Sequence, residues 1–574
     1  MKSDSRRRLV RSFTLGVALG LGVWGLRSLT THAQEPAPAP SAAPSEAAPA
    51  PAESPAAAAP APAPAEPRGP DPTGAVTGTA ADVPVKDAAK PTLIEVMDTV
   101  GHNKIAINIT WTLLTGFLVM FMQTGFAMVE TGFTRAKNAA HTFSMNYMVY
   151  PIGMFGYWVC GFAMQMGGVG AVAALGGTPG LSHEYVVTLF GKPFGLMGTS
   201  GFFLGGDVYD VGVFALFLFQ MVFMDTTVTI PTGAMAERWK WSSFLCFGFF
   251  MSMFVYPLFG NWVWGGGWLS QLGANFGLGH GHVDFAGSSV VHMVGGVAAL
   301  AGAWVLGPRI GKYTKDGKPV AIPGHHIPMA LVGTLILAFG WFGFNPGSTL
   351  AGTDLRIAVV ATNTMLAGTG GAIAAMIYMM SRFGKPDPSM MANGMLAGLV
   401  AITAPCAFVT APVAMLIGAI AGVLVCLSVF FIEGTLKVDD PVGAISVHGV
   451  NGAWGVLSLG LFADGKYGDG WNGVPGTVTG LFYGNSSQFF AQCIGTLTCF
   501  AFVFVSFYLF FKLVDAVIGN RVSAEVEIGG LDLPEMGALA YPEFATSPGS
   551  SYSISAPSAS PAGAALTAKQ AEAL

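Results

Sequence analysis

Two histidines stand out because they occupy the same position in two related segments of the chain. Residues 284–296 and 440–452 both follow the pattern D-x-x-G-x-x-x-V-H-x-V-x-G, with six identities in thirteen positions. The histidines are His292 and His448, and both lie in apolar surroundings. A neutral imidazole offers one hydrogen-bond donor and one acceptor, and it titrates close to physiological pH. The pair could therefore solvate a small polar molecule or share and relay a proton.

The aspartates that open these segments have a simpler interpretation. Asp284 and Asp440 directly precede helical runs, and Pro441 stands at a first-turn position, so both aspartates are expected to cap helices. We assign Asp284 a structural, orienting role. A single membrane histidine can merely hydrogen-bond a neighbouring helix. Two histidines at equivalent positions favour a functional site, because ionisable groups inside a membrane usually serve function.

The composition places these residues in an all-α integral membrane protein. The 574 residues are 52% hydrophobic and only 10% charged, whereas soluble proteins carry about a quarter charged residues. The six cysteines lie in apolar runs without metal-motif spacing. Neither a nucleophile–base set nor a basic stripe is present. We therefore expect no enzyme, no cofactor and no nucleic-acid partner.

Eleven apolar stretches are long enough to cross a bilayer. Thirteen lysines and arginines fall in the connections after odd-numbered stretches, against three (Lys192, Arg356 and Lys466) in the others. This bias predicts an outside N-terminus and a cytoplasmic C-terminus. The fifth and tenth stretches then run in opposite directions, as in an inverted five-helix repeat whose binding site lies near the midplane. The predicted stretches are 106–133, 138–167, 211–235, 241–264, 285–307, 326–346, 355–381, 389–410, 412–436, 442–463 and 486–516.

The two ends of the chain differ from this central part. Residues 1–33 combine basic residues, a short apolar run and a small-residue cleavage site, as in a secretory signal peptide; an uncleaved anchor is the alternative. Residues 34–100 form an Ala/Pro-rich linker, expected in the periplasm. Residues 101–518 are the membrane domain, and 519–574 a cytoplasmic tail, disordered at its end. The expected location is the cell inner membrane.

Several motifs resemble the ammonium transporter (Amt/Mep/Rh) family, and its Amt branch in particular. The resemblance rests on residues 284–292 (DFAGSSVVH) and 439–452 (DDPVGAISVHGVNG). Further matches at 135–138, 233–238, 264–267 and 341–345 follow in the family's order, across roughly residues 105–541. The resemblance implies a homotrimer with one narrow pore per chain, carrying ammonium or ammonia, and a tail that could meet a PII-type signal protein.

The resemblance also implies roles for individual residues. Trp264, Phe223 and Ser348 would form an outer ammonium site, Phe223 and Phe344 a stacked gate, and the two histidines the pore beneath it. The spacing agrees, since Phe344 and Ser348 are four residues apart and share a helix face. Asp225 departs from expectation. It follows Phe223 by two residues, about 200° around a helix, so we expect it to point away from the pore and to serve helix packing or a subunit contact.

Three functions remain open at this point. An aromatic site gains about 0.5–2 kcal/mol from a cation, far less than the several kcal/mol that desolvating an ion costs. Ammonium would therefore lose its proton, cross as ammonia and be reprotonated inside. The alternatives are an ammonium sensor that signals through its tail and an Rh-like channel for neutral ammonia. An aquaporin is disfavoured because 345–347 (NPG) is an isolated near-match. Gly443 also departs from the family resemblance, because some members of the ammonium transporter family carry an acidic residue at this position.

Overall fold

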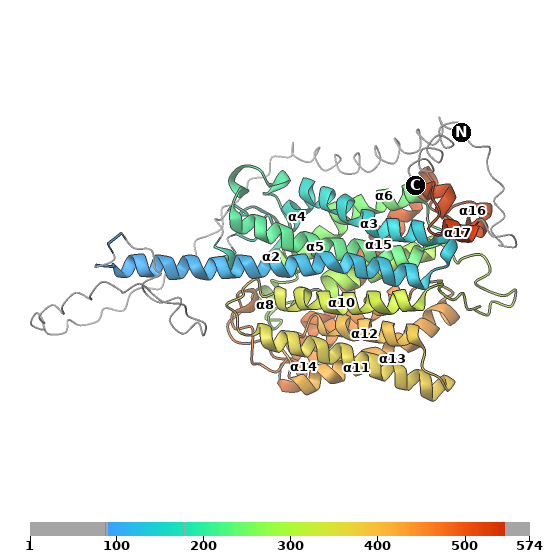
Figure 1. Ribbon diagram of the computed structural model, residues 1–574. Coiled ribbons are helices and arrows are strands. Elements are labelled where there is room, and N and C mark those ends of the chain that lie inside the picture. Colours follow the sequence, from blue (N-terminus) through green and yellow to red (C-terminus); the bar gives the residue numbers. More distant parts are fainter. Residues whose placement is uncertain (1–85, 88–89, 171, 177–179, 546–574) are drawn as a thin grey trace, which may run out of the picture.

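A computed structural model describes residues 86–545 of the chain, apart from 88–89, 171 and 177–179. The described part is a bundle of helices that lie nearly parallel to one another (Figure 1). The predicted signal peptide, most of the predicted linker and residues 546–574 of the tail lie outside the described residues.

Helices account for most of the described chain. Five π-helical turns interrupt or extend α-helices, at 157–161, 251–255, 288–293, 432–436 and 445–450, and a separate π-helical turn lies at 532–536. The α-helices are α2 (Leu93–Phe133), α3 (Ala139–Gly156), α4 (Phe162–Met166), α5 (Val211–Met235), α6 (Trp241–Phe250), α7 (Tyr256–Trp264), α8 (Leu272–Phe276), α9 (Val294–Leu306), α10 (Ile327–Gly347), α11 (Ile357–Phe383), α12 (Pro388–Ile402), α13 (Ala411–Phe431), α14 (Asn451–Phe462), α15 (Ser486–Val517), α16 (Ala524–Gly529) and α17 (Pro542–Ala545).

The lengths and apolar character of the helices are those expected of a membrane protein. In the described chain, nine helical segments are long and apolar enough to cross a bilayer, and Pro388–Ile402 is a shorter apolar helix. The predicted stretch 138–167 is also helical, because α3, the turn at 157–161 and α4 follow one another without a break. Every predicted apolar stretch therefore overlaps a helix, although the helix in 389–410 ends at Ile402. The prediction of a helical membrane protein is confirmed at this level.

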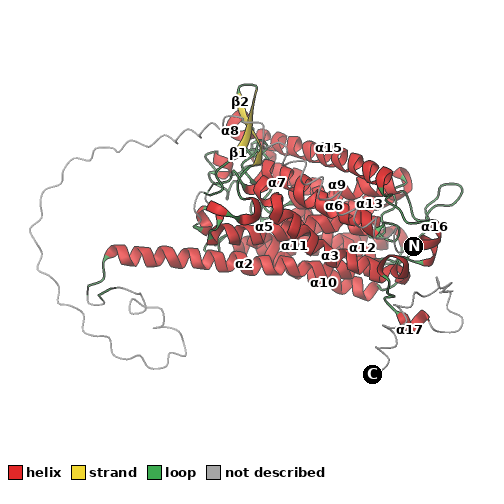
Figure 2. Cartoon of the chain, turned by 90° about the horizontal axis from the view of Figure 1, so that it is seen from above, coloured by secondary structure: helices red, strands yellow, loops and turns green. Residues whose placement is uncertain are grey.

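A β-hairpin departs from the all-α expectation. Strands β1 (Glu184–Leu189) and β2 (Lys192–Gly198) pair antiparallel through a two-residue turn. Both turn residues, Phe190 and Gly191, have positive φ, as a tight hairpin turn requires. Trp262 of α7 donates to the Leu196 carbonyl (2.9 Å), so the hairpin rests on the end of α7. It lies at the opposite end of the bundle from α16 and α17 (Figure 2).

Helix α2 begins earlier than its apolar stretch. Thr92 and Glu95 form a capping box, which starts the helix at Leu93 rather than near residue 106. Its 41 residues span about 60 Å, twice the thickness of a hydrocarbon core. The first turns therefore project beyond the bundle (Figure 1). Hydropathy missed them because residues such as His102 and Lys104 are polar, while the helix is set by its cap.

The residues after α15 close the other end of the bundle. The carboxylate of Asp532 accepts hydrogen bonds from the backbone N–H groups of Ala140 and His141, the first turn of α3. Glu527 accepts from the Ile310 N–H in the connection after α9 (2.7 Å). This segment therefore ties the start of α3 to the end of α9, at the end of the bundle where α2 finishes (Figure 1).

Candidate functional site

The twin segments fold in the same way, which brings the two histidines into equivalent positions. His292 lies in the π-helical segment Ser288–Met293, and His448 lies in the π-helical segment Ile445–Val450. Both segments are followed directly by α-helix. Isolated π-helical turns are rare and frequently occur at functional sites. The sequence pattern indicated the repeat, but it carried no signal for this helix type.

Each segment is held at its start by the aspartate eight residues before the histidine. Asp284 is buried and accepts four backbone hydrogen bonds of 2.7–3.0 Å, from the N–H groups of residues 287–290. Asp440 accepts from the N–H groups of Val442, Gly443 and Ile445. Oxygen acceptors at this position satisfy the free N–H groups of a helix start. Asp284 and Asp440 therefore fix where the histidine-bearing helices begin.

Glycines allow the two segments to approach each other. Gly287 and Gly443 occupy equivalent repeat positions and have φ values of 114° and 82°, which strain any residue with a side chain. The segments themselves meet at Gly296, where an added Cβ would lie 2.1 Å from the Gly449 backbone nitrogen. The repeat thus places its small residues where the two backbones cross.

The two imidazoles are in direct contact. His292 Nδ1 lies 3.1 Å from His448 Nδ1, and the rings are 5.2 Å apart and 21° from parallel. Both side chains are buried. A nitrogen–nitrogen hydrogen bond needs a proton on one atom and a lone pair on the other. The pair is therefore arranged to hold one proton between its Nδ1 atoms.

Aromatic rings continue the line on one side of the histidines. The Phe344 ring lies 5.4 Å from the His292 ring, and Phe223 stacks on Phe344 at 4.1 Å and 25°. Phe223 comes from α5 and Phe344 from α10. The structure therefore brings together the two phenylalanines that sequence analysis paired, directly against the histidines.

Beyond the phenylalanines lies a cavity of about 210 Å³ at the hairpin end of the bundle. Trp264, Phe223 and Ser348 line it together, with Phe285 and Trp471 among the other walls. Trp264 donates from its indole N–H to the Asp284 carbonyl (2.7 Å), and Ser348 donates to the Phe344 carbonyl (2.8 Å). The serine oxygen keeps its lone pairs for a donor. Aromatic faces beside a hydroxyl acceptor suit a small cation.

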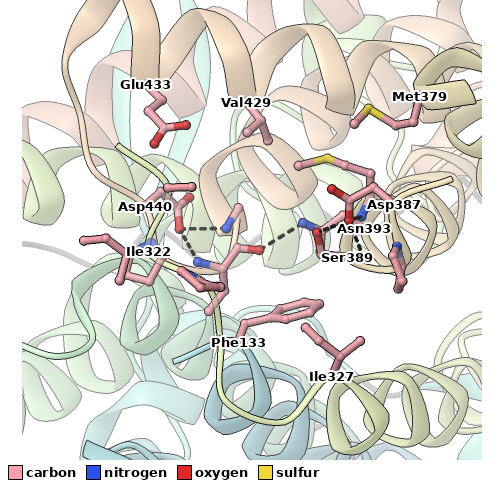
Figure 3. A pocket seen from close by; sticks show the side chains of 18 of the residues that line it. Phe133, Ile322, Ile327, Met379, Asp387, Ser389, Asn393, Val429, Glu433 and Asp440 are labelled. Carbon is pink, nitrogen blue, oxygen red and sulfur yellow. Dashed lines mark hydrogen bonds between the residues drawn. The ribbon is translucent and has the colours of Figure 1, made fainter. Parts of the chain in front are cut away.

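On the other side of the histidines lie a small cavity and a larger one, which share wall residues. His448 lines a cavity of about 20 Å³ together with Glu130, Asn393 and Val442. Asn393 and Val442 also border a cavity of about 690 Å³ at the opposite end of the bundle from the hairpin. Figure 3 shows its wall, where the Asn393 amide donates to the Val442 carbonyl (3.0 Å) and Asp440 accepts from the backbone. Sequence analysis missed Glu130 and Asn393.

Asp225 lies away from this line of cavities. It borders neither the cavity beneath Trp264 nor the one beside His448. The side chain is only 1% exposed within a single chain, so it is not on a surface that another chain could touch. Its Oδ1 atom has no hydrogen-bond partner among the described residues. Of the two expected roles, the burial favours helix packing over a subunit contact.

Three of the sequence motifs meet in a buried ion network at the tail end of the bundle. Arg309 makes a two-pronged contact with Asp439 (2.8 and 2.9 Å) and contacts Glu237 (2.9 Å), which also pairs with Arg135. Arg238 donates to the Asp439 carbonyl. Burial opposes ionisation of Asp439, but the bonds and charges of Arg309 and Arg238 hold its pKa well below the ordinary value. These motif residues fix the structure around the large cavity, and they do not line the cavities beside Trp264 and His448.

Comparison with known proteins gives one family. The sequence model of the Ammonium Transporter Family matches residues 110–541. Ammonium transporter Amt2 of Archaeoglobus fulgidus is 46% identical over 443 residues, which cover 77% of this chain and 89% of the relative. Ammonium transporter Amt1 of Haloferax mediterranei is 36% identical over 450 residues, covering 76% and 80%.

Solved structures are also similar to this chain. A structure titled Sensor Amt Protein superposes with a TM-score of 0.66 at 35% identity, and the match covers 76% of this chain and 99% of the other. Saccharomyces cerevisiae Mep2 has a TM-score of 0.62 at 25% identity, covering 73% of this chain and 89% of Mep2.

Proposed function

This chain belongs to the ammonium transporter family, and on that premise we propose that it carries ammonium across the cell inner membrane. The proposal rests above all on one observation, the 3.1 Å contact between His292 and His448 in line with the stacked phenylalanines. The relatives are named transporters, and no enzymatic activity is proposed.

The outer cavity would collect ammonium. A cation gains about 0.5–2 kcal/mol over an aromatic face, which Trp264 and Phe223 offer, and Ser348 offers an oxygen acceptor. Stripping an ion of water costs several kcal/mol, so the stacked Phe223 and Phe344 rings would block the hydrated ion. Ammonium therefore gives up its proton to the histidine pair and passes the phenylalanines as ammonia.

The histidine pair would carry the separated proton. One proton on the 3.1 Å Nδ1–Nδ1 contact can move between His292 and His448 without any movement of the backbone. Ammonia passes beside the same rings and is reprotonated on the inner side. Net positive charge then crosses the membrane with each ammonium, which makes the transport electrogenic.

We propose eleven membrane-spanning helices, with a periplasmic N-terminus and a cytoplasmic C-terminus. Arg135, Lys137, Arg309 and Arg521 gather at the end of the bundle that holds α16, as cytoplasmic residues would. The twin folds of the two histidine segments support an inverted five-helix repeat. A homotrimer, a role in nitrogen uptake and a PII-type partner at the tail are proposed from the family resemblance.

The test is a charge measurement on the purified protein in liposomes. An inward pulse of ammonium should produce a sustained current, and an equal pulse of potassium should not. A transient charge displacement without sustained current would contradict electrogenic transport. Internal alkalinisation without current would then indicate an Rh-like channel for neutral ammonia, and saturable ammonium binding without either would indicate a sensor.

Two observations support a separate test of the sensor function. A solved structure similar to this chain is titled Sensor Amt Protein, and Asp532 of the tail is hydrogen-bonded to the first turn of α3. Removing the residues after 545 keeps the hydrogen bonds of Glu527 and Asp532 to the bundle, and it should leave the current in place if the end of the tail only reports occupancy. Loss of a partner's response in cells, with the current retained, would favour signalling.

Replacing Trp264 by leucine should weaken ammonium capture without stopping transport. Loss of about 0.5–2 kcal/mol of cation–π energy raises the ammonium concentration for half-maximal current by about two- to thirtyfold. Trp264→Phe is the control, since it keeps an aromatic face but loses the same hydrogen bond to the Asp284 carbonyl. Equal shifts in the two variants would assign the effect to that hydrogen bond instead.

A further inference from the structure

A buried glutamate lies beside the histidines and is not explained by the proposed function so far. Glu130 is 3% exposed and stands in the last turn of α2, three residues before its end. Its Oε2 atom accepts hydrogen bonds from the Asn146 amide of α3 (2.6 Å) and the Thr232 hydroxyl of α5 (2.7 Å). Sequence analysis passed over it because it lies within an apolar stretch.

Glu130 and His448 border the same small cavity. That cavity has a volume of about 20 Å³, and about 10–15 Å³ is enough for one water-sized molecule. Phe126, one helical turn before Glu130, has its ring 6.0 Å from the His448 ring. Glu130 therefore lies about 6 Å further along α2, in the direction of the large cavity. A single ammonia or water molecule in this cavity would have Glu130 and His448 among its walls.

The described side chains around Glu130 hold it in place but offer no positive charge to compensate a carboxylate. Its hydrogen-bond donors, the Asn146 amide, the Thr232 hydroxyl and the Gly233 backbone, are all uncharged. In the described part of the chain Glu130 forms no ion pair, and the charged side chain that acts on it is the like-charged Asp440. The remaining walls of the cavity are apolar except for Asn393 and His448. Burying a carboxylate this way is costly, so packing alone gives no reason for it.

The network around Glu130 also fixes its geometry. Asn146, which donates to Glu130, accepts through its Oδ1 from the Thr229 hydroxyl (2.7 Å), and Gln123 donates to that same hydroxyl (2.8 Å). A carboxylate oriented by two fixed donors, beside a cavity for one molecule, is arranged to receive a proton or a cation.

We propose that Glu130 is the proton-exchange group at the inner end of the pore, a step that rests on the proposed function. The proton leaves protonated His448 and binds the Glu130 carboxylate, so that the imidazole becomes neutral and the carboxyl becomes neutral. Ammonia in the small cavity then takes this proton, which regenerates the carboxylate and yields ammonium. The carboxylate balances the charge of the new cation until it enters the large cavity, past Asn393 and Val442.

The deciding variant is Glu130→Gln, which cannot be ionised but can accept the same two hydrogen bonds through its amide oxygen. Its sustained ammonium current in liposomes should fall at least about tenfold. Ammonia should still pass without its proton, so internal alkalinisation, followed with a trapped pH dye, should be larger in this variant than in wild type, which delivers a proton with each ammonia. Glu130→Asp keeps a carboxyl and should recover part of the current. Glu525→Gln, at an exposed position of α16, is the matched control and should change neither.

Each outcome is informative. Wild type without current contradicts the proposed function itself, whatever Glu130 does. An unchanged current in Glu130→Gln, with wild type active, overturns the role of Glu130 alone. Loss of both current and ammonia conduction in Glu130→Gln, with no recovery in Glu130→Asp, also overturns it, because that pattern is the one a packing role predicts.

Discussion

The His292→Ala variant should lose its sustained ammonium current by about a hundredfold or more, the range that removing a positioned proton-transfer group costs. In wild type His292 Nδ1 contacts His448 Nδ1 at 3.1 Å, and the His292 ring also stacks against Phe344 at 5.4 Å. Alanine removes both contacts. The proton released at the outer cavity then has no acceptor between the phenylalanines and His448, and the charge-carrying route is interrupted.

The measurement is the charge displaced by an ammonium pulse on liposomes, at matched protein density. His183→Ala is a suitable control, because His183 is exposed at the hairpin end and borders none of the cavities on the path. It should behave as wild type. A sustained current of normal size in correctly folded His292→Ala would contradict a proton route through the histidine pair.

The second large effect is on stability. Replacing Asp439 by asparagine should lower the free energy of unfolding by about 3–5 kcal/mol, because it removes one of the two carboxylates that compensate the buried Arg309 and leaves only Glu237. Arg309 is 2% exposed and holds Asp439 with two short contacts. Glu433→Gln is the control. Glu433 pairs with Lys312 but is 26% exposed, so its loss should cost about 1 kcal/mol or less.

The Asp439 effect should also depend on pH in a defined direction. The folded-state pKa of Asp439 is depressed, against an unfolded value of about 3.9. The carboxylate therefore stabilises the protein fully above the unfolded pKa, and this contribution is lost as the pH falls through the folded pKa. Unfolding in mixed detergent micelles should show a full gap between wild type and Asp439→Asn at pH 7. The gap should shrink below about pH 4. A gap that stays constant down to pH 3 would contradict this account.

The helical membrane fold and the family could be predicted from sequence because both depend on local patterns. A stretch of about 20 apolar residues crosses a bilayer whatever its neighbours are. Each predicted stretch overlaps a helix of the structure, although the helix in 389–410 ends at Ile402. The family resemblance is confirmed by the match over residues 110–541. The hairpin at 184–198 escaped prediction because its strands are only six and seven residues long, and they are stabilised by pairing with each other and with α7.

The candidate site was likewise predicted in part from the sequence. The repeated pattern identified His292 and His448, and the shared helix face linked Phe344 with Ser348, because these relations follow from spacing along the chain. Spacing does not determine the helix type, so the π-helical turns at both histidines were not predicted. In the structure those turns lie between the aspartate caps and the crossing of the two segments at Gly296, which are contacts that spacing along the chain does not give.

By itself, then, the sequence determined a helical membrane protein of the ammonium transporter family and the pair of histidines at its centre. Hydropathy, charge bias and an internal repeat are properties of consecutive residues. They can be recognised without knowing which segments pack against one another. Only the tertiary structure decided that the Nδ1 atoms face each other and that Glu130 borders the cavity beside His448. Those facts depend on how α2, α3, α5 and the twin segments pack, because contacts between distant segments set which face of each helix meets the pore.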